Sequence, residues 1–418
     1  NYNIYIIYKM SMYSGGEIKT IILDPVNHID NNRSEFRLDT HDVYTNDLRL
    51  TNIGVAESIV GNKYGLLAGS YGVIKHIYLM DGQTTLSSTK HANLWLGWRN
   101  LVKSNSNNEC LSSVVNQNDL GFVLTTAGIV GEKRYDDYTK IAGNSGWLDL
   151  KSVLPMLGAV SSLHTKLMPN LKIVVEYENS KQHIARSTTA NYTTKRPTLC
   201  CDVIQNEGVK NNLMANMPSN VVWTEIEHDE LILPAVPVSA TTDHITQSIS
   251  HKVNGFDNKT LNRVLIQKQN SVSANNVNGA DVIGFGAMGS LAQFKFKTNY
   301  VVNGSNILTS KGVQGEAQRL ALLCDTWGNV NIVPNSHIFG GQGNDNLYQD
   351  GVNRKAQLCY DGVFVGERIR DFKIDIERVG IHNGGTQLQQ NNQLNVHIWG
   401  EVSKSLNVKN GMYNLTYL

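Results

Sequence analysis

Apolar and charged residues alternate strictly in the stretch Phe372-Lys373-Ile374-Asp375-Ile376-Glu377. A period of two places the apolar side chains on one face of an extended strand and the charged ones on the other. The same alternation occurs in residues 394–399 and 294–297. It is typical of half-buried strands in a β-sandwich, where one sheet face packs on the core and the other meets solvent.

Further apolar runs of strand length are spread over the whole chain. They are residues 35–39, 72–80, 171–178, 221–233, 261–269 and 411–418. Pairs of residues with strong turn preference separate such runs. These pairs are Asp81-Gly82, Asn254-Gly255, Asn303-Gly304, Asp361-Gly362 and Asn410-Gly411. Many short strands divided by turns predict an all-β sandwich architecture.

Helical periodicity is scarce. The best pattern predicts a helix from about Ser152 to Met168, with Pro155 in the first turn and Pro169 beyond its end. A second, shorter helix is predicted around residues 316–324. With so few helices, parallel βαβ units are not expected. We predict that the few short helices lie in the connections between strands.

The chain shows signs of being doubled. Residues 171–176 and 372–377 share an apolar-Lys-Ile-x-apolar-Glu pattern at an offset of 372 − 171 = 201 residues, near half the chain. The Asn- and Met-rich segment 211–218 then marks the boundary between the halves. We therefore predict an N-terminal arm over residues 1–19, a first sandwich over 20–215 and a second over 216–418.

The composition indicates a globular protein of balanced charge. The chain has 418 residues, with 37 Lys+Arg against 36 Asp+Glu and a formal net charge of +1. A nucleic-acid-binding arm or a polybasic membrane anchor needs clustered cationic charge, so neither is expected. No apolar stretch approaches the ~20 residues of a membrane-spanning helix, so no membrane span is predicted.

The five cysteines form no C-x-x-C pair, and the amino end lacks the pattern of a signal peptide. A reducing compartment is therefore the expected place of folding.

Two glycine-rich stretches resemble ligand-binding motifs. Gly284-Phe285-Gly286-Ala287-Met288-Gly289 fits the G-x-G-x-x-G dinucleotide pattern, but a strand pattern follows where the helix that binds the pyrophosphate should begin. Gly340-Gly341-Gln342-Gly343-Asn344-Asp345 matches one unit of a calcium repeat that normally works in stacked copies. Loops are the favoured interpretation of both, and a solitary ion site in the second stretch stays open.

The densest ionisable cluster consists of Glu225, Glu227, His228, Asp229 and Glu230. Glu227 and Asp229 would share one face of a strand, where paired carboxylates can serve acid–base chemistry. A solvated strand edge is the favoured interpretation.

Trp95 and Trp98 suit packing in the core or a subunit interface better than a ligand platform. No nucleophile or metal motif such as G-x-S-x-G or H-E-x-x-H occurs. We assign no catalytic, cofactor-binding or metal-ligating residue and expect no cofactor.

Several segments together resemble a known family. Residues 69–82 followed by 94–98 look like the first-domain strand pair of major capsid proteins from polinton-like viruses and virophages, and 148–178 resembles the segment that closes their first jelly roll. Five further segments resemble the second jelly roll of these proteins. They are residues 226–230, 253–257, 371–379, 394–402 and 411–418. Residues 1–9 have no counterpart in this resemblance.

The resemblance implies a double jelly-roll subunit, similar in plan to adenovirus hexon. Such a subunit forms a homotrimer that serves as a pseudo-hexameric capsomer and tiles the icosahedral shell of a double-stranded DNA virus. The implied partners are neighbouring capsomers, penton proteins and minor capsid (cement) proteins, without specific nucleic-acid binding. The implied location is the virion shell, assembled inside the host cell, and the implied role is structural and not enzymatic.

Two other classes of function remain open from the residues. A two-domain carbohydrate-binding protein would use Asn- and aromatic-rich loops around a sugar site. A hydrolase on a β-sandwich would need paired carboxylates such as Glu227 and Asp229 beside a cleft.

Overall fold

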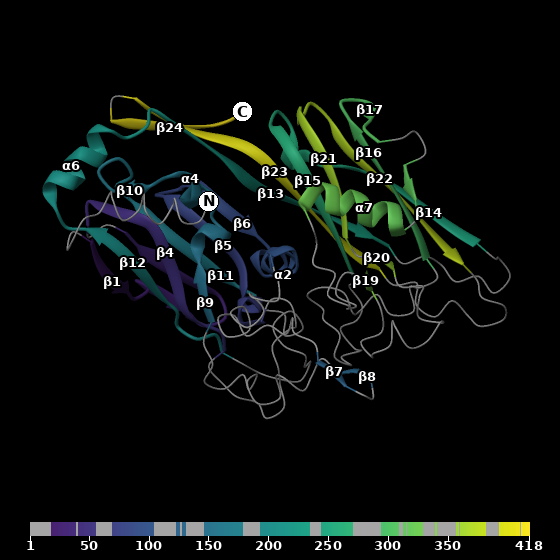
Figure 1. Ribbon diagram of the computed structural model, residues 1–418, viewed down its shortest axis with the longest axis horizontal. Helices are drawn as coiled ribbons and strands as arrows, with labels where there is room; N and C mark the ends of the chain where they lie inside the picture. The colour runs from purple at the N-terminus through teal and green to yellow at the C-terminus, as the bar shows by residue number, and fades with distance from the viewer. Residues whose placement is uncertain are drawn as a thin grey trace.

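The alternating stretches become antiparallel strands in a computed structural model of the chain. The structure describes residues 18–38, 41–55, 69–103, 123–125, 128–130, 146–178, 193–234, 244–270, 294–308, 312–314, 316–328, 339–340, 357–358, 360–381, 393–409 and 411–418. Two β-sandwiches lie side by side (Figure 1). The strands before residue 205 build one of them, and those from residue 220 onward build the other.

The first sandwich consists of two sheets. One has the order β1-β12-β4-β10 with β9 paired to β4, and the other has the order β2-β3-β11-β5-β6. The strands of the first sheet are β1 (Ile18–Leu23), β4 (Val43–Ile53), β9 (Gly146–Asp149), β10 (Ser162–His164) and β12 (Thr198–Ile204). Those of the second are β2 (Asn27–Ile29), β3 (Arg33–Arg37), β5 (Ile74–Asp81), β6 (Thr84–Lys90) and β11 (Leu171–Tyr177).

The second sandwich repeats this plan. One sheet has the order β13-β23-β15-β21 with β24 paired to β23, and the other has the order β14-β22-β16-β17 with β18 paired to β16. Its first sheet contains β13 (Asn220–Leu233), β15 (Thr260–Asn270), β21 (Tyr360–Arg368), β23 (Leu394–Lys409) and β24 (Met412–Tyr417). The second contains β14 (His244–Lys252), β16 (Phe294–Val302), β17 (Ser305–Asn306), β18 (Val313–Gln314) and β22 (Phe372–Ile381).

Two short hairpins stand apart from these sheets. They are β7 (Val123–Thr125) with β8 (Gly128–Val130), and β19 (Phe339–Gly340) with β20 (Gln357–Leu358).

The strand order is the same in both sandwiches. We number the eight main strands of each sandwich from 1 to 8 in chain order. In the first sandwich these strands are β1, β3, β4, β5, β6, β10, β11 and β12. In the second sandwich they are β13, β14, β15, β16, β17, β21, β22 and β23. Both sandwiches then have one sheet ordered 1-8-3-6 and one ordered 2-7-4-5. An eight-stranded sandwich of this kind is a jelly roll. The similar stretches at an offset of 201 residues fall on β11 and β22, the seventh strand of each, so the doubling is confirmed.

The cores consist of the apolar faces that the alternation predicts. Phe372, Ile374 and Ile376 are fully or almost fully buried on β22, whereas the intervening Lys373 and Asp375 lie closer to solvent. Each buried aliphatic or aromatic side chain contributes about 1.5–3 kcal/mol. Most predicted strands occur within a few residues of their expected bounds.

One predicted helix is wrong. Residues 152–168 form a 3-10 turn η2 (Leu150–Ser152), a single helical turn α4 (Met156–Ala159) and strand β10. The Asn46 amide donates hydrogen bonds to the carbonyls of Leu157 and Val160, and β10 pairs with β4. These tertiary partners take backbone groups that a continuous helix would need, and tertiary context overrides local periodicity.

The other helices are short. The predicted helix at 316–324 is confirmed as α7 (Glu316–Trp327), which packs on β21. Sequence periodicity missed α2 (Ala92–Lys103) and α6 (Glu207–Ala215). Two further 3-10 turns are η1 (Gly69–Val73) and η3 (Asn254–Phe256). Within the described ranges no helix is both long and apolar enough to cross a bilayer.

One predicted turn is also wrong. Asn303 and Gly304 have φ of 52° and 84° and join β16 to β17 as a hairpin, as predicted. Asp361 and Gly362 instead lie within β21. A side chain on Gly362 would come within 2.9 Å of the Trp327 indole and 3.0 Å of Leu323, so this glycine permits α7 to approach the strand.

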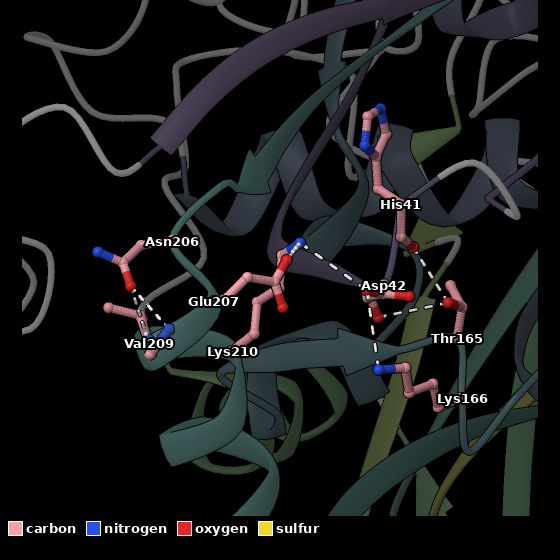
Figure 2. Close-up of polar contacts among 9 residues, drawn as sticks. His41, Asp42, Thr165, Lys166, Asn206, Glu207, Val209 and Lys210 are labelled. Atoms are coloured by element: carbon pink, nitrogen blue, oxygen red, sulfur yellow. Dashed lines mark hydrogen bonds and ion pairs between the residues drawn. The ribbon is translucent and has the colours of Figure 1, made fainter.

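Helix α6 begins the connection between the sandwiches and is held against the first one. The Asn206 side chain accepts hydrogen bonds from the Gly208 and Val209 amides and so caps the helix. Figure 2 shows Lys210 of α6 and Lys166 on either side of Asp42, each with its Nζ 3.8 Å from Oδ2 of that residue. The connection therefore leaves the first sandwich from a defined place.

The packing at Gly400 generates a stability prediction. A Cβ atom there would overlap the Phe256 ring and lie 2.8 Å from Leu261 Cδ1. Gly400→Ala should therefore lower the free energy of unfolding by about 1–3 kcal/mol through overpacking. Urea denaturation of the full chain measures this change. Gly255→Ala is the matched control, because nothing lies within 4 Å of its Cβ position, and equal losses in both variants would contradict the packing.

Candidate functional site at the junction of the sandwiches

The two sandwiches meet along β6 and β13, with α2 lying between them (Figure 1). Side chains of the second sandwich bind backbone carbonyls of the first. Lys404 Nζ donates to the Leu86 carbonyl at 2.8 Å, and Trp399 Nε1 donates to the Lys90 carbonyl at 3.3 Å. These bonds satisfy buried polar groups of both sandwiches.

Glu225 lies at the centre of this junction and is not part of a solvated edge. β13 is an edge strand of its sheet as expected, but Glu225 is only 2% exposed. Its carboxylate accepts hydrogen bonds from the Ser88 amide at 2.6 Å, the Ser87 hydroxyl at 3.3 Å and the Trp223 indole at 2.6 Å. Burial raises the pKa of Glu225, and the Lys404 charge and these donors oppose that rise. The expected solvation was wrong for Glu225, because Ser87 and Ser88 of the first sandwich bind its carboxylate, whereas Glu230 is exposed as expected.

Tryptophans fill the space beside α2. Trp95 and Trp98 of that helix are 3% and 1% exposed. Trp95 packs edge-on against Trp327 with ring centroids 5.8 Å apart and lies 6.1 Å from Trp399, both in the second sandwich. Trp98 lies 4.6 Å from Tyr360. The prediction that these tryptophans pack in a core or interface is confirmed, since aromatic pairs at such distances stabilise buried contacts.

Three histidines gather at the same junction. His91 follows β6, His228 lies on β13 and His397 lies on β23. One ring nitrogen from each can be chosen so that all three lie within 4.8 Å of one another. His228 Nε2 and His397 Nδ1 are 3.2 Å apart and share a hydrogen bond. Sequence spacing could not reveal this group, because its members come from three separate segments.

The remaining acidic residues of β13 are engaged by other side chains. Glu227 Oε1 lies 2.9 Å from Lys259 Nζ and accepts a hydrogen bond from Tyr417 at 2.6 Å. Asp229 Oδ2 lies 3.2 Å from His251 Nε2. Glu227 and Asp229 therefore form local contacts within the second sandwich.

A buried ionic group in the second sandwich was not anticipated. Lys268 Nζ and Arg319 Nε both bind the carboxylate of Asp361, and all three side chains are at most 3% exposed. Burial alone raises the pKa of Asp361, but the Arg319 and Lys268 charges outweigh burial and hold the pKa at about 2. The Asp361-Gly362 pair predicted a turn, so the buried contacts of Asp361 with two cations could not be predicted from it.

The two glycine-rich stretches lie almost entirely outside the described residues. Residues 284–289 lie outside the described residues. Of the second stretch only Gly340 is described, at the end of β19. The loop interpretation of both stretches, and the open ion site in the second, stay predictions.

The buried ionic group generates a mutational prediction. Asp361→Asn leaves two buried cations without their carboxylate, so it should lower the free energy of unfolding by about 3–5 kcal/mol. Asp371→Asn removes a carboxylate that contacts two exposed lysines, Lys252 and Lys373, and should leave the free energy of unfolding nearly unchanged. Urea unfolding at pH 6 compares the two variants, and similar losses would contradict the assigned role of Asp361.

The effect of Asp361→Asn should also depend on pH. The folded pKa of Asp361, about 2, lies below its ordinary value of 3.8. The charged carboxylate therefore stabilises the folded state fully above about pH 4, and that stability is lost as the pH falls toward 2. The gap between wild type and Asp361→Asn should shrink by about 2 kcal/mol between pH 6 and pH 2. A gap that stays constant over this range would contradict the shift.

Comparisons with known proteins identify the fold. No family model matches the sequence, and the search of curated proteins returns no match. Among solved structures, VP54 of PBCV-1, fitted into a reconstruction of the virophage Sputnik, is similar over 97% of this chain and 98% of its own, with 12% identity and a TM-score of 0.58.

Two further structures are similar over nearly the whole chain. The mavirus major capsid protein matches 95% of this chain and 90% of its own, with 8% identity and a TM-score of 0.54. The Faustovirus major capsid protein matches 95% and 92%, with 7% identity and a TM-score of 0.53. The strand orders and these similarities agree, and the chain has the double jelly-roll fold of these capsid proteins.

Proposed function

We propose that this chain is a viral major capsid protein with a structural and not an enzymatic role. It trimerises into pseudo-hexameric capsomers that tile the icosahedral shell of a double-stranded DNA virus. The observation that carries the proposal is the extent of the similarity, which covers 97% of this chain and 98% of VP54 of PBCV-1 and so spans both sandwiches.

The repeated strand order supplies the physical reason for a hexagonal capsomer. Two sandwiches of equal topology in one chain present two outer surfaces that are built from the same strand order. Three such chains around an axis place 3 × 2 = 6 sandwiches at roughly equivalent positions, and closed rotational symmetry is the usual form of soluble oligomers. The first sandwich would then span residues 20–215 and the second 216–418, with residues 1–19 as an arm.

Exposed apolar side chains on both sandwiches support contacts with neighbouring subunits. Ile22 on the edge strand β1 is 71% exposed, Phe364 on β21 is 67% exposed and Met412 on β24 is 71% exposed. Edge strands that carry apolar residues invite pairing with another chain and are usually covered in the functional assembly. We propose that a second copy of this chain covers these exposed apolar side chains in the capsomer.

The charge balance bears on the other partners. With a net charge of +1 the chain lacks the cationic excess that nonspecific binding to a genome requires. The similarity to capsid proteins supports neighbouring capsomers, penton proteins and minor capsid (cement) proteins as the proposed partners. The proposed location is the virion shell, assembled inside the host cell.

The alternative functions lack a supporting observation among the described residues. Trp95 and Trp98, the aromatic pair that a sugar platform would use, are buried at the junction. The carboxylates of Glu227 and Asp229 are occupied by Lys259, Tyr417 and His251.

The solution mass of the purified full chain tests the proposal. Light scattering coupled to size exclusion should give about 139 kDa, which is 3 × 46.3 kDa, and negative-stain images of the same peak should show hexagonal or triangular particles. Ile22→Asp should shift the mass toward the monomer, because it places a charge in the proposed contact, whereas exposed Asp24→Asn should not. A wild-type chain that stays at 46.3 kDa at all concentrations would overturn the proposal.

A further inference from the structure

We propose that His91, His228 and His397 form a binding site for a divalent transition-metal ion of the zinc class, which ties the two sandwiches together. His91 belongs to the first sandwich, whereas His228 and His397 belong to the second. Three imidazoles from both sides of a junction, with nitrogens within 4.8 Å of one another, surround one point in space. Imidazole nitrogen is a preferred ligand of zinc and of its neighbours in the first transition series.

The spacing of the nitrogens fits a tetrahedral ion. A zinc–nitrogen distance of about 2.0–2.1 Å places two ligand nitrogens roughly 3.3–3.4 Å apart. His228 Nε2 and His397 Nδ1 are already 3.2 Å apart. Binding therefore requires that the proton between them moves to the other nitrogen of the same ring, and that the His91 ring closes in by on the order of 1 Å.

The strand register holds two of the ligands in place. His228 lies directly opposite Trp399 and His397 directly opposite Glu230, so these four side chains share one face of the sheet. The His397 ring stacks on the Trp399 indole with centroids 5.6 Å apart and an interplanar angle of 28°. Trp399 in turn donates to the Lys90 carbonyl, directly before His91. One tryptophan thus positions ligands from both sandwiches.

The backbone at His91 is an independent indication of a constrained position. Its φ is 49°, in the left-handed region that residues other than glycine seldom adopt. The conformation is held by hydrogen bonds on both sides of the residue: the His91 amide donates to His76 Nδ1 at 3.0 Å, and the His91 carbonyl accepts from the Trp95 amide at 3.1 Å. Backbone strain that the surroundings maintain is common at binding sites.

The local electrostatics suit a neutral imidazole ligand. Burial holds the pKa of His228 well below its ordinary value, and the nearby His91, Lys90 and His76 act in the same direction. A neutral ring keeps a lone pair available for the ion. Glu230 Oε2 lies 4.0 Å from His91 Nε2, and the Glu230 side chain is 38% exposed. This carboxylate can supply the fourth ligand and balance the ionic charge at the solvent side of the site.

An ion in this position stabilises the junction. His91 joins the other two histidines only when the sandwiches are docked, so the ion binds that arrangement more tightly and favours it by mass action. Metal binding should therefore raise the melting temperature of the chain. This inference does not depend on the proposed capsid role, because it concerns contacts within one chain.

The test uses the purified full-length chain after removal of bound metal with a chelator and dialysis. Zinc titration followed by calorimetry should give one site per chain, and saturating zinc should raise Tm by on the order of 3 °C or more. Cobalt(II), used as a coloured probe, should show the intense visible absorption of tetrahedral coordination. Absence of zinc binding at tenfold excess, with no cobalt spectrum, would overturn the proposal.

Variants separate this site from adventitious binding. His228→Gln and His91→Gln should abolish the cobalt spectrum and the rise in Tm, and both positions are half-buried, so neither substitution empties a fully buried site. His228→Cys keeps a metal ligand and should retain binding with a sulfur-to-cobalt charge-transfer band. His251→Gln is the matched control, since His251 pairs with Asp229 outside the cluster. Binding that survives His228→Gln and His91→Gln would show adventitious sites and overturn the assignment.

Discussion

The junction between β13 and β6 is the constraint on which the rest of the structure depends. Glu225 is buried there, and two of its three hydrogen-bond donors, Ser87 and Ser88, belong to the other sandwich. Separation of the sandwiches would exchange those bonds for bonds to water, and a hydrogen bond to a charged group contributes about 1.5–3 kcal/mol net. Lys404 and Trp399 bind carbonyls of the first sandwich in the same way. These contacts therefore favour one relative orientation of the two sandwiches.

The relative orientation of the sandwiches matters for the proposed capsomer. Both sandwiches have the strand orders 1-8-3-6 and 2-7-4-5, so the chain carries two outer surfaces of the same topology. In the proposed hexagonal capsomer the angle between these two surfaces has to be constant. The tryptophans around α2 and the buried contacts of Glu225 provide that constancy, and the histidines at the same junction add a place where an ion can strengthen it.

Sequence patterns predicted much of this fold and little of the junction. Alternation located strands such as β22 and β23 because half-buried strands have a strict period of two. The helix expected from Ser152 failed because Asn46 and β4 compete for its backbone, and the turn expected at Asp361 failed because Lys268 and Arg319 neutralise a carboxylate inside a strand. Such outcomes depend on partners far away in sequence.

The histidine group illustrates the same limit. His91 and His397 are separated by 397 − 91 = 306 residues, and only docking of the sandwiches brings them together. The charge run on β13 was visible in the sequence, but the burial of Glu225 was not, because the covering surface comes from the other half of the chain. Local patterns thus predict elements, whereas the functional surfaces arise from contacts between the halves.

A reconstruction of the purified particle by electron cryomicroscopy tests the central claim most directly. The account predicts three chains around an axis, with six jelly rolls at the corners of a near-regular hexagon and each chain's β6–β13 junction intact. A particle in which the two sandwiches of one chain are separated, or one without threefold symmetry, would contradict it.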